Sequence, residues 1–488
     1  MTITDDRAGP TNAALFREQA FYGGVWRAAD NGAATDVTDP YTGARIGAVP
    51  SLNAEEVQAA IDAAAEAFPA WSRTLPRERG RLLRRWLELI ERDKEDLARL
   101  ITLENGKPLK EARAEVAYGA GFVEVYAEEA GRILGEVIPP NMAGRRLFAE
   151  REPIGVCVAI TPWNFPMAML TRKLAPALAA GCTMLCKPAA QTPFTALALA
   201  ALAEEAGMPA GVIGVVTGKA SMIGDLVTRS ATVRKISFTG STEVGARLMA
   251  ASAPTIKRLS LELGGNAPLL VFDDADLDTA IETAMVAKFR NSGQSCIAAN
   301  RIYVQRGLYE SFVSAFAARI GALKFGDGFD PETDIGPLID EAAVAKVEQH
   351  RDEAVAAGAE LVVGPASDRA RVAPPTLLRN VPRTALLTRE ETFGPLAGVI
   401  SFDSYEEGIA MANDTPFGLA AYFCSERPKT IARAGRDLES GMVGINTGLI
   451  STATVPFGGV KQSGIGREGA HQGIDEYLNT KYLCQAGL

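Results

Sequence analysis

Apolar and polar residues recur along the chain with two different spacings, and the spacing changes near residue 153. Before that point, residues 54–73 and 77–104 place apolar side chains at three- and four-residue steps, which predicts two amphipathic helices. After it, short β-branched runs alternate with Ala/Leu-rich stretches to about residue 240. That alternation predicts a parallel sheet covered by helices on both faces.

A second series of the same kind begins at residues 269–272 and predicts a second α/β unit. Its helical segments lie at 279–290, 308–324 and 340–358, and its further strand-like segments lie at 302–305 and 360–364. Two charged, alternating stretches predict antiparallel strands outside both units, at 146–155 and 476–488. Such strands either pair with another subunit or form a plain hairpin, and the pattern leaves both open.

Composition excludes several classes of protein. The 488 residues suffice for about three domains, and 47% apolar with 22% charged residues is typical of a globular protein. Fifty basic against 59 acidic side chains give a net charge of −9, so we expect no nucleic-acid partner. The N-terminus is polar and acidic, and the apolar runs fall short of the roughly 18 residues of a membrane span. We therefore expect a cytoplasmic protein with no membrane partner.

Histidine and cysteine usage narrows the chemistry further. The chain has two histidines, His350 and His471, so histidine-based catalysis and His-rich metal sites are almost excluded and no metal site is predicted. Its six cysteines lack the paired spacing of a disulfide framework, which indicates free thiols in a reducing compartment. The acidic run 273–278 resembles a calcium loop, but Thr279 replaces the required glycine, so we interpret it as a helix cap.

A strand, turn and helix pattern at 238–245 (FTGSTEVG) is a candidate phosphate site. Gly240 lies in the turn, Ser241 at the helix N-terminus, and Gly245 one turn into the helix. Helix N-termini present free N–H groups and a positive dipole end, which suit a pyrophosphate. An ordinary N-capped helix is the alternative.

Three further residues are candidates for covalent chemistry. Glu262 ends an apolar run before two glycines, where a carboxylate could be a general base. Cys296 ends a small, polar turn, a setting in which a thiol can be exposed and its pKa lowered, although a buried inert cysteine is the alternative. Asn164 lies between prolines in 162–166 (PWNFP), which fixes the loop and points a neutral donor outward.

Seven motifs in order along the chain resemble the aldehyde dehydrogenase superfamily. They are PWNFP, CKPAAQTP, FTGSTEVG, LELGG, GQSC, EETFGP and PFGGVKQSGIGREG, and the resemblance covers the chain from about residue 20 to its end. It implies an α/β fold with a Rossmann-like dinucleotide-binding domain, a second α/β catalytic domain and a small antiparallel oligomerisation arm. The implied boundaries are 1–130 with 153–262 for the first domain, 263–460 for the second, and 131–152 with 461–488 for the oligomerisation segments.

The resemblance also implies a catalytic role for each matching residue. Cys296 is the expected nucleophile, whose thiolate adds to an aldehyde to give a thiohemiacetal. Asn164 Nδ2 and the Cys296 N–H are expected to hold the oxyanion. Glu262 is expected to activate the water that hydrolyses the thioester. Glu468 resembles a glutamate proposed to relay protons, and a plain surface carboxylate is the alternative.

The same resemblance implies a nicotinamide cofactor. Lys187 is expected to bond the adenosine ribose, and the turn with Gly240, Ser241 and Gly245 to hold the pyrophosphate. Trp163 is expected to form a wall of the cofactor site. Glu391 and Phe393 are expected to contact the nicotinamide ribose and ring. Ala190 replaces a glutamate that NAD-preferring members commonly carry there. Loss of that like charge relieves repulsion of a 2′-phosphate, so we expect NADP, with NAD as second choice.

Two arginines and a serine indicate the kind of aldehyde. Arg172, Arg290 and Ser451 match the family branch that oxidises succinic semialdehyde, where they are expected to hold the substrate carboxylate. Guanidinium groups grip a carboxylate bidentately, and a neutral aldehyde would offer them no partner. Either arginine could instead pair with an acidic side chain of the protein.

The leading hypothesis is therefore a non-acylating succinic semialdehyde dehydrogenase that forms a homo-oligomer, a dimer or tetramer. Glutaric and 2-oxoglutaric semialdehydes are close alternatives, because one methylene changes discrimination by only about 1–3 kcal/mol. A broad-range enzyme and a CoA-acylating one are further alternatives, and the presence of Glu262 argues against the second. A binding protein that has lost catalysis would have no need of Cys296, Glu262 and Asn164 together.

Overall fold

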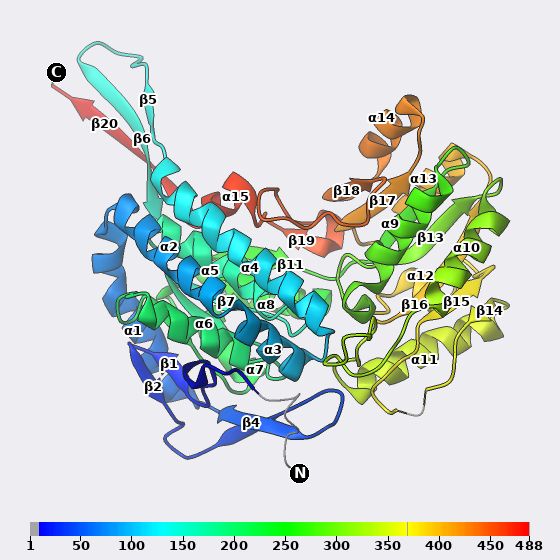
Figure 1. Cartoon of the computed structure of the whole chain (residues 1–488). Coiled ribbons are helices and arrows are strands. Elements are labelled where there is room, and N and C mark those ends of the chain that lie inside the picture. Colours follow the sequence, from blue (N-terminus) through cyan, green and yellow to red (C-terminus); the bar gives the residue numbers. More distant parts are fainter. Residues whose placement is uncertain (1–8, 368, 488) are drawn as a thin grey trace.

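Two α/β bodies lie side by side, and a three-stranded arm projects from the first of them (Figure 1). The computed structural model describes residues 9–367 and 369–487. The two series of strands and helices predicted from the sequence form the two bodies, so the predicted α/β fold class is confirmed.

The first body is built on an eight-stranded sheet in the order β19-β11-β10-β7-β8-β9-β1-β2. The five central strands are parallel, and the edge pairings of β1, β2 and β19 are antiparallel. The central strands are β7 (Val156–Ile160), β8 (Thr183–Lys187), β9 (Ile213–Val215), β10 (Val233–Thr239) and β11 (Arg258–Glu262). The edges are β1 (Ala20–Tyr22), β2 (Val25–Arg27) and β19 (Gly464–Ile465), and β3 (Ala34–Thr38) with β4 (Arg45–Pro50) forms a separate ribbon.

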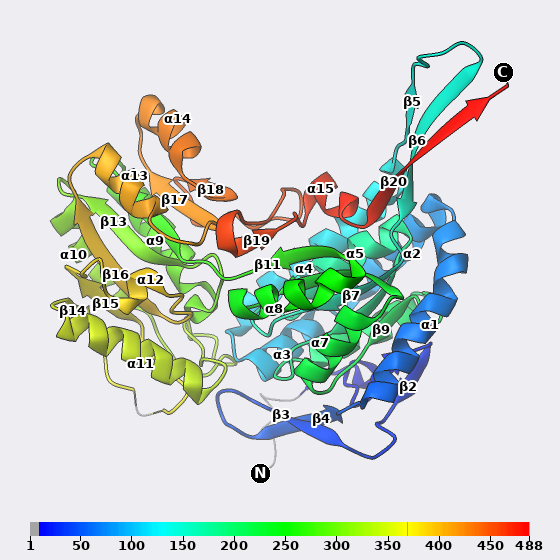
Figure 2. The same cartoon turned by 180° about the vertical axis from the view of Figure 1, so that it is seen from behind.

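Helices cover both faces of this sheet, as the alternating pattern predicted (Figures 1 and 2). One face carries α2 (Pro76–Arg92), α3 (Lys94–Asn105), α4 (Leu109–Glu129), α5 (Ala168–Ala180) and α6 (Phe194–Glu205). The other face carries α1 (Ala54–Arg73), α7 (Ala220–Arg229) and α8 (Thr242–Ser252).

The single helix predicted over 77–104 is wrong, because it breaks at Asp93 into α2 and α3. The side chain of Asp96, in the first turn of α3, accepts bonds from the backbone N–H groups of Thr11 and Asn12, each at 2.9 Å. A tertiary contact to the N-terminal segment therefore fixes the new helix direction, and the amphipathic pattern carries no trace of it.

The second body has a seven-stranded sheet in the order β14-β15-β16-β13-β12-β17-β18, parallel except for the β14–β15 pair. Its strands are β12 (Ala267–Val271), β13 (Ala299–Gln305), β14 (Glu360–Val363), β15 (Thr376–Arg379), β16 (Leu396–Phe402), β17 (Ala420–Cys424) and β18 (Met442–Ile445). Its helices are α9 (Leu277–Phe289), α10 (Tyr309–Gly321), α11 (Glu341–Ala356), α12 (Leu386–Arg389), α13 (Tyr405–Asn413) and α14 (Pro428–Asp437). Asp276 caps α9 by accepting from Thr279 N at 2.8 Å, which confirms the helix-cap interpretation of 273–278.

The arm consists of β5 (Glu136–Ile138), β6 (Arg145–Pro153) and β20 (Leu478–Ala486). β6 and β20 pair antiparallel within one chain, from Pro153 opposite Leu478 to Arg145 opposite Ala486, as the alternating stretches predicted. Among the described residues of the predicted segment 461–488, only those of β20 lie in the arm. β19 joins the first sheet, and α15 (Ala470–Asp475) packs on α4 and α5.

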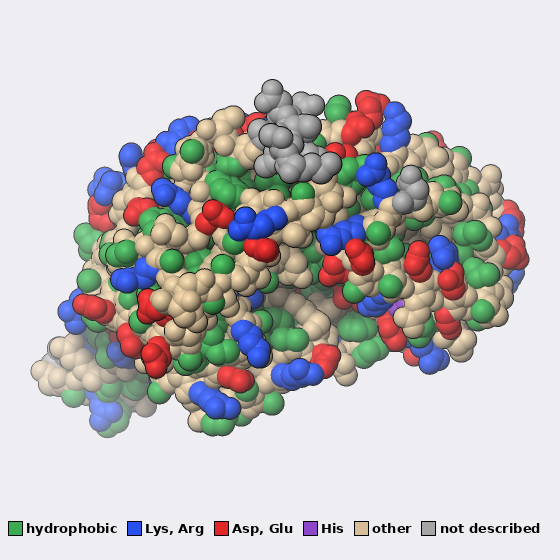
Figure 3. All heavy atoms as spheres, turned by 90° about the horizontal axis from the view of Figure 1, so that it is seen from below, with side chains coloured by type: hydrophobic (Ala, Val, Ile, Leu, Met, Phe, Trp, Pro, Cys, Tyr) green, Lys and Arg blue, Asp and Glu red, His purple; other side chains and the backbone are tan. Residues whose placement is uncertain are grey.

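Acidic and basic side chains lie next to one another over the face of the molecule seen in Figure 3. Within the described ranges, none of the helices combines the length and apolar character that a membrane span needs.

Candidate active site

A cavity of about 330 Å³ is lined by residues of both bodies. Most of the predicted site residues meet there, namely Trp163, Asn164, Arg172, Gly240, Ser241, Glu262, Arg290, Cys296, Glu391, Phe393 and Ser451. In the part of the chain that the structure describes, Lys187, Ala190, Gly245 and Glu468 are not part of this lining. Residues far apart in the sequence thus converge on one cavity.

The first body contributes the ends of its parallel strands. The loop after β7 carries Trp163 and Asn164, β10 leads into Gly240 and Ser241, and β11 ends at Glu262. All carboxyl ends of a parallel sheet lie at one edge, which is where α/β folds bind their ligands. The sheet therefore explains why these separate motifs share one site.

Cys296 lies in a tight turn, in which the N–H of Ala298 donates to Ser295 O at 3.0 Å. Gly265 packs directly against it, since a Cβ there would lie 2.2 Å from the Cys296 carbonyl oxygen. The thiol is only partly exposed. Burial raises its pKa to about 12, and the carboxylates of Glu391 and Glu262 add to the rise while Arg172 opposes it. Burial therefore outweighs the lowering of a thiol pKa that a small, polar turn can give.

Glu262 is buried, and neither of its carboxylate oxygens has a hydrogen-bond partner among the described residues. Burial raises its pKa well above the ordinary value, and the negative charge of Glu468 adds to this, against the opposing charges of Arg172 and Lys173. A carboxylate with a raised pKa and free lone pairs, facing the same cavity as a thiol, has the properties of a general base.

Asn164 is held from both its side chain and its backbone. Its Nδ2 donates to Gln294 O at 3.0 Å, and its backbone carbonyl accepts from Lys107 Nζ at 2.7 Å and Asn291 Nδ2 at 2.9 Å. An amide nitrogen carries two hydrogens, so one N–H of Asn164 Nδ2 stays available, and Asn164 lines the cavity. This placement next to the cysteine turn fits an oxyanion donor.

Glu468 is buried, so the alternative of a plain surface carboxylate is wrong. It forms ion pairs with Arg172 and Lys173, and Ser237 Oγ donates to it at 3.2 Å. Burial would raise its pKa, but Lys173 and Arg172 outweigh this, and the pKa of Glu468 is lowered. It is therefore a fixed negative charge near Glu262.

The two predicted substrate arginines are in different situations. Arg172 is paired with Glu468, and its guanidinium lies 4.2 Å from the ring centroid of Phe457. Arg290 has no carboxylate within ion-pair distance among the described residues. Its guanidinium lies 5.0 Å from the Phe165 ring centroid and 5.9 Å from that of Tyr118. The alternative of a protein carboxylate partner therefore holds for Arg172 and not for Arg290.

Trp163 and Phe393 come from different bodies and meet edge to face, with ring centroids 5.5 Å apart. Phe393 has a φ of 57°, which is rare for a bulky residue. Beside it, Glu391 Oε1 accepts from Gly265 N at 3.2 Å, and Lys346 Nζ donates to Glu391 O at 2.6 Å. Burial raises the pKa of Glu391 to about 7.

The remaining cofactor candidates lie around the same sheet edge. Lys187 is buried at the end of β8, and burial lowers the pKa of its ammonium. Ala190 is exposed just beyond it. Ser241 caps α8 by accepting from Val244 N at 3.4 Å, so the N-capped helix is present. Gly245 packs against Leu263, since a Cβ there would lie 2.3 Å from Leu263 Cδ2.

Sequence reasoning missed much of the apolar lining and its nearest polar neighbours. These residues are Tyr118, Phe165, Met169, Leu263, Ser295, Ile339, Asp340, Ala343, Lys346, Thr392 and Phe457. Tyr118, on α4, and Phe457, on the returning C-terminal segment, lie in stretches whose pattern is that of ordinary packing. Phe165 could have been predicted from the sequence, because it lies between the same two prolines as Asn164.

Comparison with known proteins agrees with this geometry. The family model described as "Aldehyde dehydrogenase family" matches residues 26–483. The chain belongs to the aldehyde dehydrogenase family. Members of the family are oxidoreductases that use NAD(P).

Three relatives show how close the similarity is. A glutarate-semialdehyde dehydrogenase of Pseudomonas putida is 54% identical, over 97% of this chain and 98% of the relative. The succinate-semialdehyde dehydrogenase [NADP(+)] GabD of Escherichia coli K12 is 54% identical, over 96% of this chain and 98% of the relative. The crystal structure of an aldehyde dehydrogenase from Brucella melitensis biovar abortus 2308 matches with a TM-score of 0.97 at 54% identity, covering 98% of this chain and 99% of that one.

Proposed function

We propose that the protein oxidises an aldehyde with a carboxylate at its far end, foremost succinic semialdehyde to succinate, with NADP as hydride acceptor. The observation that carries the proposal is Arg290, a cavity-lining cation without a carboxylate partner among the described residues, in the same cavity as the Cys296 thiol. Aromatic rings offer the N–H donors of this guanidinium no charged acceptor, and a substrate carboxylate would supply one. Ser451 lines the same cavity and adds a hydroxyl. Arg172 adds a second positive charge to the cavity, although the Glu468 carboxylate paired with it neutralises part of that charge.

The residues of the cavity account for each chemical step. Cys296 Sγ loses its proton to Glu262, the base in the same cavity, and bonds to the aldehyde carbon, while the Asn164 amide and the Cys296 N–H hold the resulting oxyanion. When bound, the oxidised nicotinamide accepts the hydride that leaves this carbon. Glu262 then takes a proton from water, whose oxygen displaces the Cys296 sulfur from the thioester. Aldehyde, NADP⁺ and water thus give carboxylate, NADPH and two protons, with no need of CoA or a histidine.

Glutaric semialdehyde is the second candidate substrate. It is supported by the relatives from Pseudomonas putida and Pseudomonas aeruginosa, named glutarate-semialdehyde dehydrogenases, at 54% and 53% identity. One added methylene shifts discrimination by only about 1–3 kcal/mol, so both acids are expected to react. 2-Oxoglutaric semialdehyde is the third.

The cofactor assignment rests on Ala190. We propose that residues 1–130 with 153–262 bind the cofactor and that residues 263–460 supply the nucleophile. The proposed cofactor contacts are Lys187, Gly240, Ser241, Trp163, Glu391 and Phe393. Gly245 supports the site by close packing. Ala190 is exposed and uncharged just beyond Lys187, so a 2′-phosphate meets no repulsion there. Ala190→Glu should lower kcat/KM with NADP at least about tenfold, because like charges brought together cost several kcal/mol. The rate with NAD serves as the internal control, and an unchanged NADP/NAD ratio would contradict the assignment.

Substitution of Arg290 tests the substrate assignment. Arg290→Gln should lower kcat/KM for succinic semialdehyde by roughly 10- to 100-fold, because a charge-assisted hydrogen bond contributes about 1.5–3 kcal/mol. Butanal, an uncharged aldehyde of the same length, should be oxidised nearly as before. Arg290→Lys is the matched control and should keep part of the preference for the acid. Equal losses for acid and neutral aldehydes would contradict a carboxylate contact at Arg290.

We also infer a homo-oligomer, a dimer or tetramer, in which the arm contacts a second subunit. The cytoplasmic location expected from the sequence stays a prediction.

A further inference from the structure

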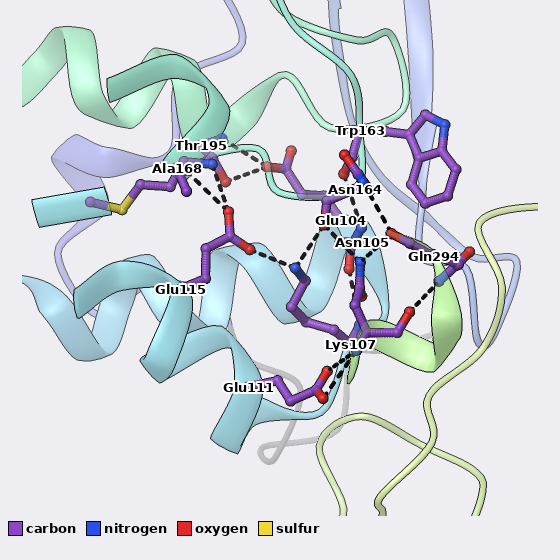
Figure 4. Close-up of polar contacts among 12 residues, drawn as sticks. Glu104, Asn105, Lys107, Glu111, Glu115, Trp163, Asn164, Ala168, Thr195 and Gln294 are labelled. Atoms are coloured by element: carbon purple, nitrogen blue, oxygen red, sulfur yellow. Dashed lines mark hydrogen bonds and ion pairs between the residues drawn. The ribbon is translucent and has the colours of Figure 1, made fainter. Parts of the chain in front are cut away.

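A buried polar network joins the loop 162–166 to the start of helix α4 (Figure 4). At its centre, the side chains of Lys107 and Glu115 are fully buried, and Lys107 Nζ lies 2.5 Å from Glu115 Oε2. Burial of two charges costs free energy unless further hydrogen bonds offset it. The other partners of this ion pair therefore indicate what it does.

Lys107 and its neighbour Asn105 hold two successive carbonyls of the loop. Lys107 Nζ donates to Asn164 O at 2.7 Å, and Asn105 Nδ2 donates to Trp163 O at 2.9 Å. A second donor, Asn291 Nδ2, reaches the same Asn164 oxygen at 2.9 Å. Figure 4 shows Lys107 between Glu115 and Asn164. The backbone of Asn164 is thus fixed by side chains from outside its own loop.

Glu115 fixes the other end of the same loop. Its Oε1 accepts from Met167 N at 2.9 Å and from Ala168 N at 3.3 Å, at the start of helix α5. Between these two anchors lies Phe165, whose ring centroid is 4.0 Å from Lys107 Nζ. One ion pair therefore holds the loop on both sides of its cavity-lining residues.

We propose that Lys107, held by Glu115, is a positioning residue that fixes the Asn164 carbonyl and thereby aims the Asn164 amide at the reacting carbon. This inference rests on the proposed function, because Lys107 acts through the oxyanion role of Asn164. Lys107 is not part of the cavity lining in the described part of the chain, so it touches no substrate.

The test replaces the ion pair without leaving a lone charge. Lys107→Met alone would strand the buried Glu115 carboxylate, so the variant is Lys107→Met with Glu115→Gln, which keeps an acceptor for Met167 N. Glu104→Leu is the matched control. Glu104 is buried in the same region and accepts from Phe194 N at 2.7 Å and Thr195 N at 2.9 Å, so its loss perturbs stability without touching the Asn164 carbonyl.

The expected result is a loss confined to the chemical step. The double variant should lose about 10- to 100-fold in kcat with succinic semialdehyde, since a misplacement of about 1 Å costs that much. KM and the Kd of NADP, measured by fluorescence titration, should stay unchanged, as for an interaction made only in the transition state. Glu104→Leu should lose comparable stability and keep kcat near the wild-type value. A wild-type kcat for the double variant, or an equal loss for Glu104→Leu, would overturn the inference.

A double-mutant cycle with Asn164→Ala separates this inference from the proposed function. If Lys107 acts through Asn164, the ion-pair replacement should cost nothing further in the Asn164→Ala background. Independent, multiplying losses would overturn the positioning role and leave the proposed function intact. Full activity of Asn164→Ala by itself would overturn the oxyanion role, and the positioning role with it.

Asn291→Gly gives a second route that leaves the ion pair in place. It removes the other donor to Asn164 O, and glycine suits the backbone φ of 53° at this position. It should show the same loss in kcat at constant KM, again absent in the Asn164→Ala background. An unchanged kcat would overturn the claim that the bonds to the Asn164 carbonyl matter.

Discussion

Cys296 shows how burial and distant charges together set the chemistry of one residue. The motif GQSC predicted Cys296 as the nucleophile, but the carboxylates of Glu391 and Glu262 that raise the pKa of its thiol lie far away in the sequence. The pairing of Arg172 with Glu468 could not be predicted from the sequence either, because it depends on how the last motif folds back onto helix α5. Motifs therefore predicted which residues gather here, whereas their protonation states follow from three-dimensional neighbours that no spacing reveals.

Glu468→Gln tests the electrostatic link to Glu262. The negative charge of Glu468 favours the protonated form of Glu262, in which it could not act as the proposed base, and so raises its pKa. Without that charge, the pKa of Glu262 falls and the base is ionised at lower pH. The acidic limb of the pH profile of kcat, measured where thioester hydrolysis limits turnover, should shift to lower pH. A shift to higher pH, or none, would contradict the link.

The same substitution should also reduce stability. Arg172 and Lys173, both fully buried, lose their shared partner, and breaking a buried pair costs about 3–5 kcal/mol. The free energy of unfolding, from urea titration followed by fluorescence, checks this. Glu282→Gln is the control and should cost less than about 1 kcal/mol, because both its carboxylate and its partner Arg319 are exposed.

Whole helices and strands were the most predictable level of the structure. Helix 54–73 and the strands around 269–272, 302–305 and 360–364 follow from local spacing, which burial of one face enforces. One exception is the break between α2 and α3, where Asp96 binds the N-terminal segment. A contact between residues so distant in the sequence leaves no periodic signal.

Asp96→Ala tests whether that contact stabilises the junction. The substitution leaves the N–H groups of Thr11 and Asn12 without their acceptor and should cost about 1–3 kcal/mol of unfolding free energy. Glu95→Ala is the neighbouring control. Glu95 is exposed and pairs with Arg113, so its loss should cost less than about 1 kcal/mol. Equal effects of the two substitutions in urea titrations would count against a specific role of Asp96.

The arm has exposed apolar side chains that packing within a single chain does not explain. It exposes large apolar side chains, with Val137 at 70% and Tyr482 at 61% relative exposure. Strands that extend from a body in this way commonly meet a second subunit. The alternation of apolar and polar residues predicted the strands, but the number of subunits depends on contacts between chains, which the pattern of one chain does not encode.

Charge placed on the arm should change the assembly. Val137→Glu combined with Tyr482→Glu should shift the mass measured by light scattering toward the monomer, because buried unpaired carboxylates oppose association. Val355→Glu, at an exposed position on α11 of the second body, is the control and should leave the mass unchanged. An unchanged mass for the arm variant would contradict its role in assembly.

The most direct test of the whole account is a set of initial rates on the purified protein. Succinic, glutaric and 2-oxoglutaric semialdehydes are compared with uncharged aldehydes of equal length, each with NADP and NAD and without CoA, by absorbance of the reduced cofactor. We predict a kcat/KM for the acids roughly 10- to 100-fold above that of the neutral aldehydes, as the charge-assisted contact at Arg290 requires. Equal values for acids and neutral aldehydes would contradict the assignment and leave an aldehyde dehydrogenase of broad range.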